Sequence, residues 1–480
     1  MTASARHFDV IVVGSGAGGA PLAALLAEAG RHVCILEAGG PVEPTGAEEA
    51  LARYYLAGGT TVAVGNSAVA IPVGKALGGT TAINSGTCLR PPDSVIEGWD
   101  RALGSPLFAA AREHLAAVER DIGVTVPPLE LLGRSHHLFL RGLEGLDLPE
   151  PFILPRNAPG CRGSGMCCFG CPTRSKQSTD LSYVPRATAA GASLRVHTEA
   201  TCIRPERGGV RVRIRTRGRG HEELLCDELV LAGGAFGTVR MIRQNRLGSR
   251  WRRAGDHMTV HPATKVTALF PEPVHGERGV PQGMGLEVPH LPGLTVEGIF
   301  TPADALIPLF VAAGNDLGWW LDRHDHLACM GMMITDRGRG SVRYLGSQPV
   351  LRYHLHRDDV RTLVEGLKLL ARVYLRAGAT RVQLPIASEH NEVSSEREVE
   401  QIDAGAVKPR QIMTAGFHPL GTAAAGRVVD PELRLVGEPR IRVCDGAVLP
   451  GPPGVNPQLT IMATAHHLAH RMTSGSRAAA

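Results

Sequence analysis

The chain has 480 residues, of which 43% are hydrophobic and 20% charged, and its 51 basic and 46 acidic residues give a formal net charge of +5. This length allows large buried cores and more than one domain. So small a net charge gives no reason to expect a nucleic acid or a membrane surface as a partner. No uninterrupted apolar run is long enough to predict a membrane span.

The first residues lead directly into a predicted strand, which leaves no room for a secretory signal. We therefore expect a cytoplasmic protein. Its ten cysteines are then expected to be reduced or bound to metal rather than paired in disulfides.

The first forty residues predict a strand, a glycine-rich turn, a helix and a second strand. An apolar run over residues 8–13 precedes the glycine-rich turn 14–19, a helical stretch covers 20–29, and a second apolar run, 33–36, ends at Glu37. This order and spacing are those of the βαβ unit that binds dinucleotides. The alternative is a turn of the same shape that binds no nucleotide.

The glycines of this turn have separate roles in such a unit. Gly14 lets the chain turn tightly, Gly16 lets the backbone approach a pyrophosphate, and Gly19 lets the helix pack close to the strand. The helix N-terminus offers free N–H groups to the phosphates. Glu37 stands about twenty residues beyond the turn, where a carboxylate binds ribose hydroxyls and repels a 2′-phosphate. The unit predicts an adenine dinucleotide other than NADP.

A second glycine-rich stretch, LGGTTAINSG, covers residues 77–86. Gly78 and Gly79 expose backbone N–H groups, and Thr80 and Asn84 add small polar side chains, so this stretch can lie flat against a planar ring or a diphosphate. A connection without a special role is the alternative for this stretch taken alone.

Together with the opening unit, which ends in LEAGG, the second stretch resembles the glucose–methanol–choline (GMC) family of FAD-dependent oxidoreductases. The resemblance implies that the dinucleotide is FAD. It also implies that Gly78, Gly79, Thr80 and Asn84 lie beside the pyrophosphate and the isoalloxazine of this cofactor.

Four cysteines lie close together in the segment 160–172, GCRGSGMCCFGCP. The C-x5-C-x3-C spacing of Cys161, Cys167 and Cys171 suits an iron–sulfur cluster better than zinc, which usually takes two separated pairs. Some members of the family carry a cluster on a related run, but Arg162 stands where they have an adjacent second cysteine. The residues that follow resemble those of long-chain alcohol oxidases instead. A cluster, a redox-active disulfide and a structural loop over the active site all stay open.

The middle of the chain predicts helices over residues 99–126 and 136–145, and then strands over 193–203, 210–216 and 228–231. A helix follows the last of these strands. In the family, this second strand–turn–helix returns to the FAD domain and packs near the adenosine.

Two single residues of this region are candidates for the site. By resemblance, Cys202 occupies the position whose backbone holds the adenine edge, while a strand residue facing the core is the alternative for its side chain. His261 lies in a motif, HMTVHP at 257–262, and belongs to the His-Pro pair that the family often has there. It either lines a wall near the flavin or is a structural histidine.

Several strands between residues 266 and 385, with a helix over 358–377, predict an antiparallel sheet with helices on one side. This is the architecture of the substrate domain in the family. The region holds no motif that names a substrate.

The last seventy residues match the C-terminal signature of the same family. Oxidising an alcohol moves a hydride to flavin N5 while the hydroxyl loses a proton, which an imidazole can accept. By resemblance His418 is this base, and Asn456 orients the substrate hydroxyl or steadies the reduced flavin. Asn456 and Pro457 are expected as N-cap and first residue of a terminal helix whose positive end faces the flavin. Asp445 and Gly446 are expected to reach the ribityl chain and pyrophosphate.

These predictions combine in an α/β chain, α+β overall, with a Rossmann-like FAD-binding domain and a second substrate domain built on an antiparallel sheet covered by helices. The FAD-binding domain is expected at 1–100, 190–255 and 411–480, and the substrate domain at 101–189 and 256–410.

The predicted function is oxidation of the CH–OH group of a small, apolar alcohol, with oxygen or a redox carrier as the electron acceptor. One alternative is lyase or isomerase chemistry on the same scaffold. Another is a redox-sensing flavin-binding protein that uses the cysteine-rich segment as its switch.

Overall fold

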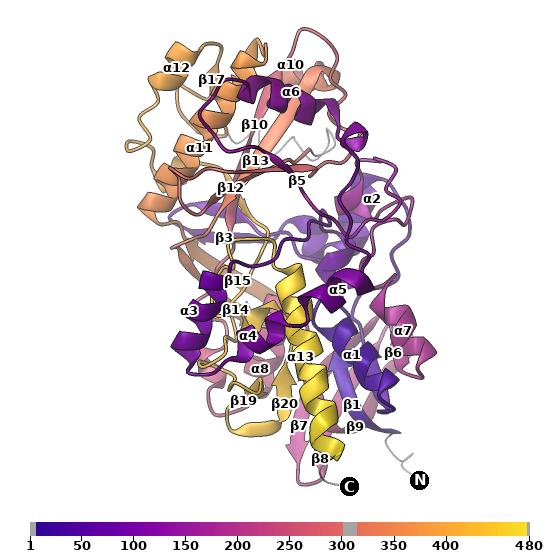
Figure 1. The fold of residues 1–480 in the computed structure, drawn as a ribbon. Helices are drawn as coiled ribbons and strands as arrows, with labels where there is room; N and C mark the ends of the chain where they lie inside the picture. The colour runs from indigo at the N-terminus through magenta and orange to yellow at the C-terminus, as the bar shows by residue number, and fades with distance from the viewer. Residues whose placement is uncertain (1–5, 301–313, 478–480) are drawn as a thin grey trace.

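The structure is a computed structural model that describes residues 6–300 and 314–477. Within these ranges the chain forms two β-sheets with helices packed on them (Figure 1). One sheet is largely parallel and the other largely antiparallel. This mixed architecture confirms the predicted fold class.

The first sheet has eight strands, and its parallel part has the order β20-β9-β1-β2-β6. β19 flanks β20, while β7 and β8 extend the sheet from the first half of β9. The strands are β1 (Arg6–Val13), β2 (Val33–Leu36), β6 (Ser193–Arg195), β7 (Thr198–Glu206), β8 (Gly209–Thr216), β9 (Gly220–Leu231), β19 (Arg434–Leu435) and β20 (Glu438–Val443).

The opening βαβ unit forms as the sequence predicts. β1 and β2 pair in parallel from Val10 opposite Val33 to Val13 opposite Leu36, and the helix between them begins at Gly19. β2 and most of β1 are buried, and α1 packs against both strands.

The helices that surround both sheets are α1 (Gly19–Glu28), α2 (Ala47–Tyr54), α3 (Asp93–Leu103), α4 (Leu107–Arg112), α5 (Leu115–Asp121), α6 (Arg134–Leu143), α7 (Tyr183–Ala189), α8 (Gly234–Asn245), α10 (Leu317–Leu321), α11 (Arg357–Arg376), α12 (Glu396–Glu400) and α13 (Gln458–Arg477). The last helix, yellow in Figure 1, lies against α1, α4 and α5. It therefore closes one face of the first sheet with residues from both ends of the chain.

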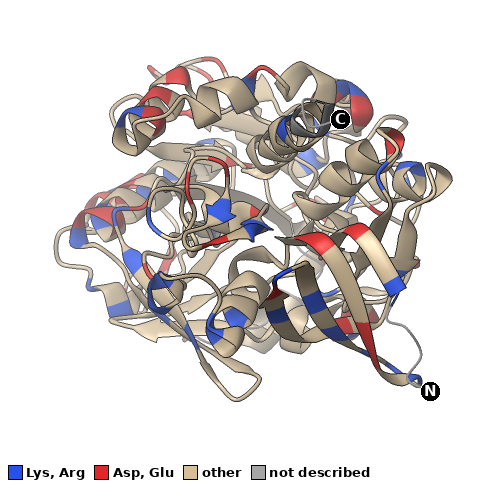
Figure 2. Cartoon of the chain, turned by 90° about the horizontal axis from the view of Figure 1, so that it is seen from below, with Lys and Arg blue, Asp and Glu red and all other residues tan. Residues whose placement is uncertain are grey.

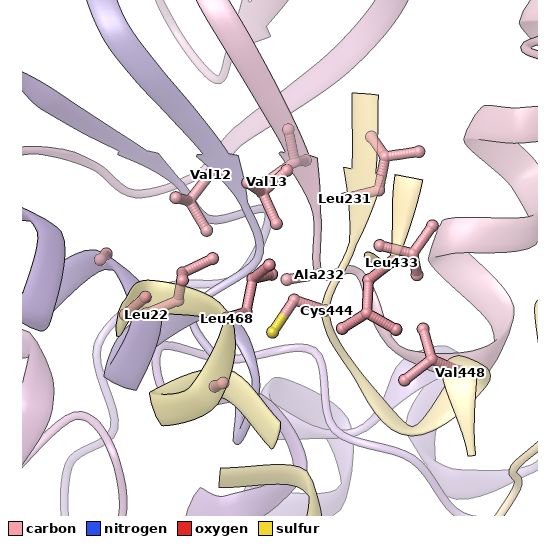
Figure 3. Close-up of a cluster of buried hydrophobic side chains, with 14 of the residues drawn as sticks. Val12, Val13, Leu22, Leu231, Ala232, Leu433, Cys444, Val448 and Leu468 are labelled. Carbon is pink, nitrogen blue, oxygen red and sulfur yellow. The ribbon is translucent and has the colours of Figure 1, made fainter. Parts of the chain in front are cut away.

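Side chains from distant parts of the chain fill the core beneath this helix. Figure 3 shows Val12 of β1, Leu22 of α1, Leu231 of β9, Cys444 after β20 and Leu468 of α13 in one cluster. All five side chains are buried. Burial of apolar area at about 25 cal/mol per Å² is the main force that joins these distant segments.

The second sheet has twelve strands and carries the order β14-β15-β3-β4-β18-β10-β13-β12-β11-β5. Two of its pairs, β15–β3 and β18–β4, are parallel, and the other pairs along this order are antiparallel. The strands are β3 (Val62–Gly65), β4 (Ala68–Ala70), β5 (Phe152–Ile153), β10 (Pro262–Leu269), β11 (Met284–Glu287), β12 (Leu294–Glu297), β13 (Leu327–Ile334), β14 (Arg339–Leu345), β15 (Gln348–His354), β16 (Arg381–Gln383), β17 (Glu392–Val393) and β18 (Thr414–Gly416).

Helix α11 covers the second sheet, as the sequence predicts. It has Asp358 and Asp359 in its first turn and Arg376 in its last, which suits the helix dipole. Its apolar stripe packs on β10 and β13. Helix α6 packs against α11 and against β13. Figure 1 shows α6 and α11 together in the upper part of the molecule.

Three predicted elements differ in detail. The helix predicted over residues 99–126 is three helices, and the first break, between α3 and α4, falls where Gly104 takes a left-handed φ of 69° and Pro106 follows. The strand predicted over residues 193–203 breaks at His197, whose φ is 50°. The terminal helix begins at Gln458, one residue later than predicted.

Sheet membership also differs from the predicted domain ranges. β3 and β4 fall in 1–100 and β18 falls in 411–480, yet all three strands belong to the second sheet. Conversely, α4, α5 and α7 fall in 101–189 but pack against α13 and α1. Local sequence patterns indicate a strand or a helix but not the sheet that it joins, so the chain crosses between the two sheets more often than the ranges imply.

Positive and negative residues are interspersed over the face seen in Figure 2, in keeping with the small net charge. Within the described part of the chain, no helix is long and apolar enough to cross a membrane.

Candidate active site

The glycines of the opening turn differ in the space around them. Gly14 has a φ of 110°, and a Cβ on it would lie 2.2 Å from the carbonyl oxygen of Ala232. A Cβ on Gly19 would lie 2.0 Å from the carbonyl oxygen of Gly14. By contrast, a Cβ on Gly16 would meet nothing closer than 3.9 Å. Packing therefore requires glycine at positions 14 and 19, while the space beside the backbone of Gly16 is open.

Glu37 is held at the end of β2 by three donors. Its carboxylate accepts the backbone N–H and the hydroxyl of Ser15, over 3.0 and 2.7 Å, and the N–H of Gly39 over 2.8 Å. A carboxylate has about four acceptor positions, so one remains for a further donor. Burial raises the pKa of this carboxyl, while the three hydrogen bonds lower it.

The second glycine-rich stretch is tied to both ends of the chain. The N–H of Gly78 donates to the hydroxyl of Ser15 over 2.9 Å, which joins this stretch to the opening turn. Asn84 donates from Nδ2 to Oε1 of Gln458 over 3.0 Å, which joins it to the first residue of α13. Gly79 lies next to Gly16, since a Cβ on Gly79 would be 3.1 Å from the Gly16 Cα. The motifs from three regions thus meet.

A buried lysine holds the far end of this stretch. Nζ of Lys176 donates to the carbonyl oxygens of Ala82, Asn84 and Cys167 over 2.9, 2.7 and 2.8 Å. The side chain is 1% exposed, and burial lowers the pKa of its amine. Lys176 thereby fastens the cysteine-rich segment to the glycine-rich stretch.

The cysteines of the segment 160–172 have separate partners. Cys167 accepts a hydrogen bond from Arg156 over 3.1 Å, Cys161 accepts the N–H of Gly163, and Cys171 lies against its neighbour Thr173. Because cluster ligands must converge on one point, such an arrangement is unsuited to metal.

Neither form of cysteine chemistry that the spacing left open is present in the structure. In the described ranges no three His, Cys, Asp or Glu side chains are grouped to hold a metal ion, so an iron–sulfur cluster is not supported. All ten cysteines are free thiols, so the disulfide is not formed either. The segment packs as a loop against the second glycine-rich stretch.

Asp445 follows β20 and faces the second strand–turn–helix. Its Oδ2 accepts the N–H of Gly234 over 2.8 Å and the hydroxyl of Thr238 over 2.5 Å, and its Oδ1 accepts the N–H of Ala447 over 2.8 Å. Burial raises the pKa of this carboxyl to about 6. Gly446, next in the chain, is buried. Cys202 lies on β7 beside a bulge in the pairing with β8 and is partly buried.

His418 pairs with a second histidine that the sequence left ambiguous. Its Nδ1 lies 2.9 Å from Nδ1 of His261, and the two rings are nearly perpendicular at 89°. Burial lowers the pKa of both rings, that of His418 to about 4, so both are neutral at pH 7. Nε2 of His261 accepts the N–H of Gly454 over 3.3 Å. Only Nε2 of His418 is left for another molecule.

The backbone of His261 is held in an uncommon conformation. Its φ is 49°, a left-handed value that costs free energy outside glycine. The carboxylate of Asp336 accepts the backbone N–H groups of Val260 and His261 over 3.1 and 3.2 Å, and the hydroxyl of Tyr353 over 2.6 Å. This buried carboxylate clamps the turn that aims the imidazole at His418.

Asn456 lies in a second buried polar group. Its Nδ2 donates to Oε2 of Glu297 over 3.4 Å, the same oxygen accepts Nε2 of Gln282 over 2.8 Å, and Gln282 in turn accepts the hydroxyl of Thr87 over 2.6 Å. Burial raises the pKa of the Glu297 carboxyl to about 7. Oδ1 of Asn456 and Oε1 of Glu297 have no partner among the described residues.

Two predicted details of the C-terminal signature are corrected here. Asn456 does not cap α13 with its side chain, which is turned to Glu297 instead. Pro457 lies just before the helix, and its carbonyl oxygen accepts the N–H of Ile461 over 3.0 Å.

Sequence reasoning missed the partners of both signature residues. Glu297 is an acid that directly follows Val296 at the end of β12, and this contrast was a usable signal. His261 was singled out, but its pairing with a residue 157 positions away carries no local signal. Lys176 and Gln458 were likewise part of recognised motifs without a predicted role.

Comparison with known proteins shows which family the chain resembles. Models of the GMC oxidoreductase family match residues 51–263 and 336–465. A GMC-type oxidoreductase of Mycobacterium tuberculosis is 38% identical over 96% of this chain and 75% of its own length. One of Sinorhizobium fredii is 30% identical over 98% of this chain and 95% of its own. A long-chain-alcohol oxidase of Arabidopsis thaliana is 26% identical over 97% of this chain and 68% of its own.

Solved structures share the whole fold at low identity. Pyridoxine 4-oxidase of Mesorbium loti has a TM-score of 0.72 at 18% identity and covers 97% of this chain and 99% of its own. A formate oxidase of Aspergillus oryzae has a TM-score of 0.71 at 15% identity, and the match covers 99% of this chain and 100% of the oxidase. A fungal aryl-alcohol oxidase has a TM-score of 0.65 at 15% identity, and the match covers 98% of this chain and 99% of the oxidase.

Proposed function

The chain belongs to the GMC oxidoreductase family, and on this premise we propose that it is an FAD-dependent enzyme that oxidises the CH–OH group of a small alcohol to an aldehyde or ketone. The observation that carries the proposal is the meeting of two polar pairs at one loop. Gly454 of this loop binds His261, which holds His418, and Asn456 of the same loop binds Glu297.

The residues of the first sheet fit FAD. The open backbone of Gly16 and the N-terminus of α1 suit a pyrophosphate, and the remaining acceptor position of Glu37 suits a ribose hydroxyl. Asp445 and Gly446 would lie toward the ribityl chain. When bound, FAD supplies the acceptor for the hydride at flavin N5.

Gly78, Gly79, Thr80 and Asn84 would line the cofactor from the other side. Gly79 lies against Gly16, which supports this arrangement. The backbone of Cys202 and the N-terminal end of α13, with Pro457, would complete the site. The FAD-dependent oxidoreductase of Chaetomium thermophilum, which shares the fold, supports this choice of cofactor.

His418 would accept the hydroxyl proton during turnover. A neutral imidazole is a competent proton acceptor, and Nε2 is the nitrogen left free by His261. Asn456 would orient the alcohol, because its Nδ2 is bound to Glu297 and its Oδ1 is buried without a partner. The alcohol has one hydroxyl proton, so it would be donated to this oxygen when the substrate binds and to Nε2 of His418 during turnover.

The substrate class proposed is an apolar primary or secondary alcohol. The long-chain-alcohol oxidases among the relatives support this choice. Oxygen or a redox carrier would accept the electrons. The division into an FAD-binding and a substrate domain follows the two sheets, with the crossings of β3, β4 and β18 described above.

Anaerobic mixing of the FAD-loaded enzyme with a panel of straight-chain and alicyclic alcohols tests the proposal through bleaching of the flavin absorbance. We expect apolar alcohols to bleach it, and His418→Gln to slow bleaching by about 10² to 10⁴. His467→Gln, on the flank of α13, is the matched control and should keep the wild-type rate. Bleaching by no alcohol, or an unaltered rate in His418→Gln, rejects the proposal. Peroxide formation in air, against reduction of an artificial acceptor, identifies the electron acceptor.

A further inference from the structure

Both ring nitrogens of His261 face a hydrogen-bonding partner. Nδ1 lies 2.9 Å from Nδ1 of His418, and Nε2 accepts the backbone N–H of Gly454 over 3.3 Å. The residue is 1% exposed, and Asp336 clamps its backbone. The ring is too buried to meet a substrate and can act only through His418.

These hydrogen bonds determine where the protons sit. Both rings are neutral at pH 7, and a neutral imidazole carries one N–H. Because Gly454 donates to Nε2 of His261, the proton of His261 is on Nδ1, which donates to Nδ1 of His418. The single proton of His418 is then on Nε2.

We propose that His261 is a positioning residue that sets the tautomer of His418, so that Nε2 of His418 carries a proton in the resting site and donates to a substrate oxygen. This inference rests on the proposed function, in which His418 meets the alcohol. It goes further in stating that the resting enzyme holds His418 as a donor and not as a base.

Because each neutral ring carries one proton, three proton shifts must occur before His418 can accept a proton at Nε2. One proton leaves Nε2 of His418 for water, one from water joins Nε2 of His261, and the shared proton crosses to Nδ1 of His418, so no proton is gained or lost. The new N–H of His261 then points at the N–H of Gly454, so this contact has to open. Gly454 lies two residues before Asn456. The loop that carries Asn456 thereby controls proton acceptance at His418.

Nitrogen-15 NMR of the FAD-loaded enzyme, labelled at histidine, tests the tautomer without turnover, because the shift of each ring nitrogen reports whether it carries the proton. The signals of His418 are assigned by their loss in His418→Gln. We expect its proton on Nε2, and a resting proton on Nδ1 overturns the inference. The measurement does not depend on any alcohol reducing the flavin, so failure of the proposed function is seen separately.

His261→Asn supplies a second test, because its amide replaces Nδ1 and has no atom that reaches Gly454. The amide oxygen can then accept from Nδ1 of His418, and we expect the proton of His418 to move there. Flavin reduction should rise above wild type in His261→Asn, because Nε2 of His418 then accepts a proton without this exchange, and should fall at least about tenfold in His261→Ala.

The matched control is His136→Asn, since His136 is also buried and its Nε2 accepts the N–H of Gly283 over 3.3 Å. This variant should leave the signals of His418 unchanged. An unchanged tautomer in His261→Asn, or equal rates in His261→Asn and His261→Ala, contradicts the inference. If the His261 variants do not fold, the wild-type spectrum alone decides it.

Discussion

Asn84 donates a hydrogen bond to the side chain of Gln458 over 3.0 Å and thereby joins residues 374 positions apart. Gln458 also donates from Nε2 to the carbonyl oxygen of Thr87 over 2.7 Å, so the first residue of α13 holds the second glycine-rich stretch at Asn84 and at the residue that directly follows the stretch. The end of the chain that bears Asn456 is in this way fixed against the stretch proposed to run along the flavin.

The first prediction separates a glycine needed for the cofactor from glycines needed for the fold. Gly16→Ala should fold with wild-type stability but bind FAD at least about tenfold more weakly, because its Cβ has room in the protein and enters the space proposed for the pyrophosphate. Gly14→Ala and Gly19→Ala are the comparison, and each should lose about 2 kcal/mol or more of unfolding free energy. Denaturant unfolding of the apoprotein and titration with FAD measure both. Unchanged FAD affinity in Gly16→Ala contradicts the proposed cradle.

The second prediction concerns the buried carboxyl of Glu297, whose pKa is raised from 4.5 to about 7 by burial. Because the folded protein holds this proton more tightly than the unfolded chain, the carboxyl lowers stability progressively as the pH rises from the unfolded pKa to the folded one. Above both values the loss is about 3 kcal/mol. Glu297→Gln should therefore gain stability relative to wild type by up to this amount between about pH 5 and 8.

Unfolding free energies of Glu297→Gln and wild type, compared across this pH range, check the prediction. The control is Glu97→Gln, since Glu97 is exposed on α3 and its loss should change stability by no more than about 0.5 kcal/mol across this range. A pH-independent difference for Glu297→Gln as well would show that the carboxyl titrates normally.

The third prediction concerns Lys176, whose amine satisfies three buried carbonyl oxygens. Lys176→Met leaves the oxygens of Ala82, Asn84 and Cys167 without this donor, so we expect a loss of about 3 kcal/mol and weaker FAD binding. Lys408→Met, which changes an exposed lysine, should alter stability by no more than about 0.5 kcal/mol. Wild-type stability and FAD affinity in Lys176→Met would contradict the role assigned to this lysine.

The fourth prediction concerns the cysteine-rich segment. Because Cys161, Cys167 and Cys171 have separate partners, anaerobically purified protein should contain no stoichiometric iron or acid-labile sulfide and should show only flavin bands. Cys161→Ser should leave this spectrum unchanged. Iron and sulfide in a fixed ratio to FAD, lost in Cys161→Ser, would instead establish a cluster.

The opening unit shows how much local sequence can predict. The apolar runs of β1 and β2, the glycine-rich turn and the position of Glu37 predicted a βαβ unit, and the structure pairs Val13 with Leu36 as such a unit requires. Strand and helix periodicity, turn glycines and the spacing of motifs are properties of short stretches, so they can be read from the chain directly.

By itself the sequence determined the family, the fold class and the signature residues His418 and Asn456. Only the tertiary structure decided that His261 pairs with His418, that Glu297 holds Asn456, and that the cysteines of one short segment take separate partners. The physical reason is that these contacts join residues far apart in the chain, or depend on the path of a loop. Long-range packing brings such residues together, and no local period or spacing encodes it.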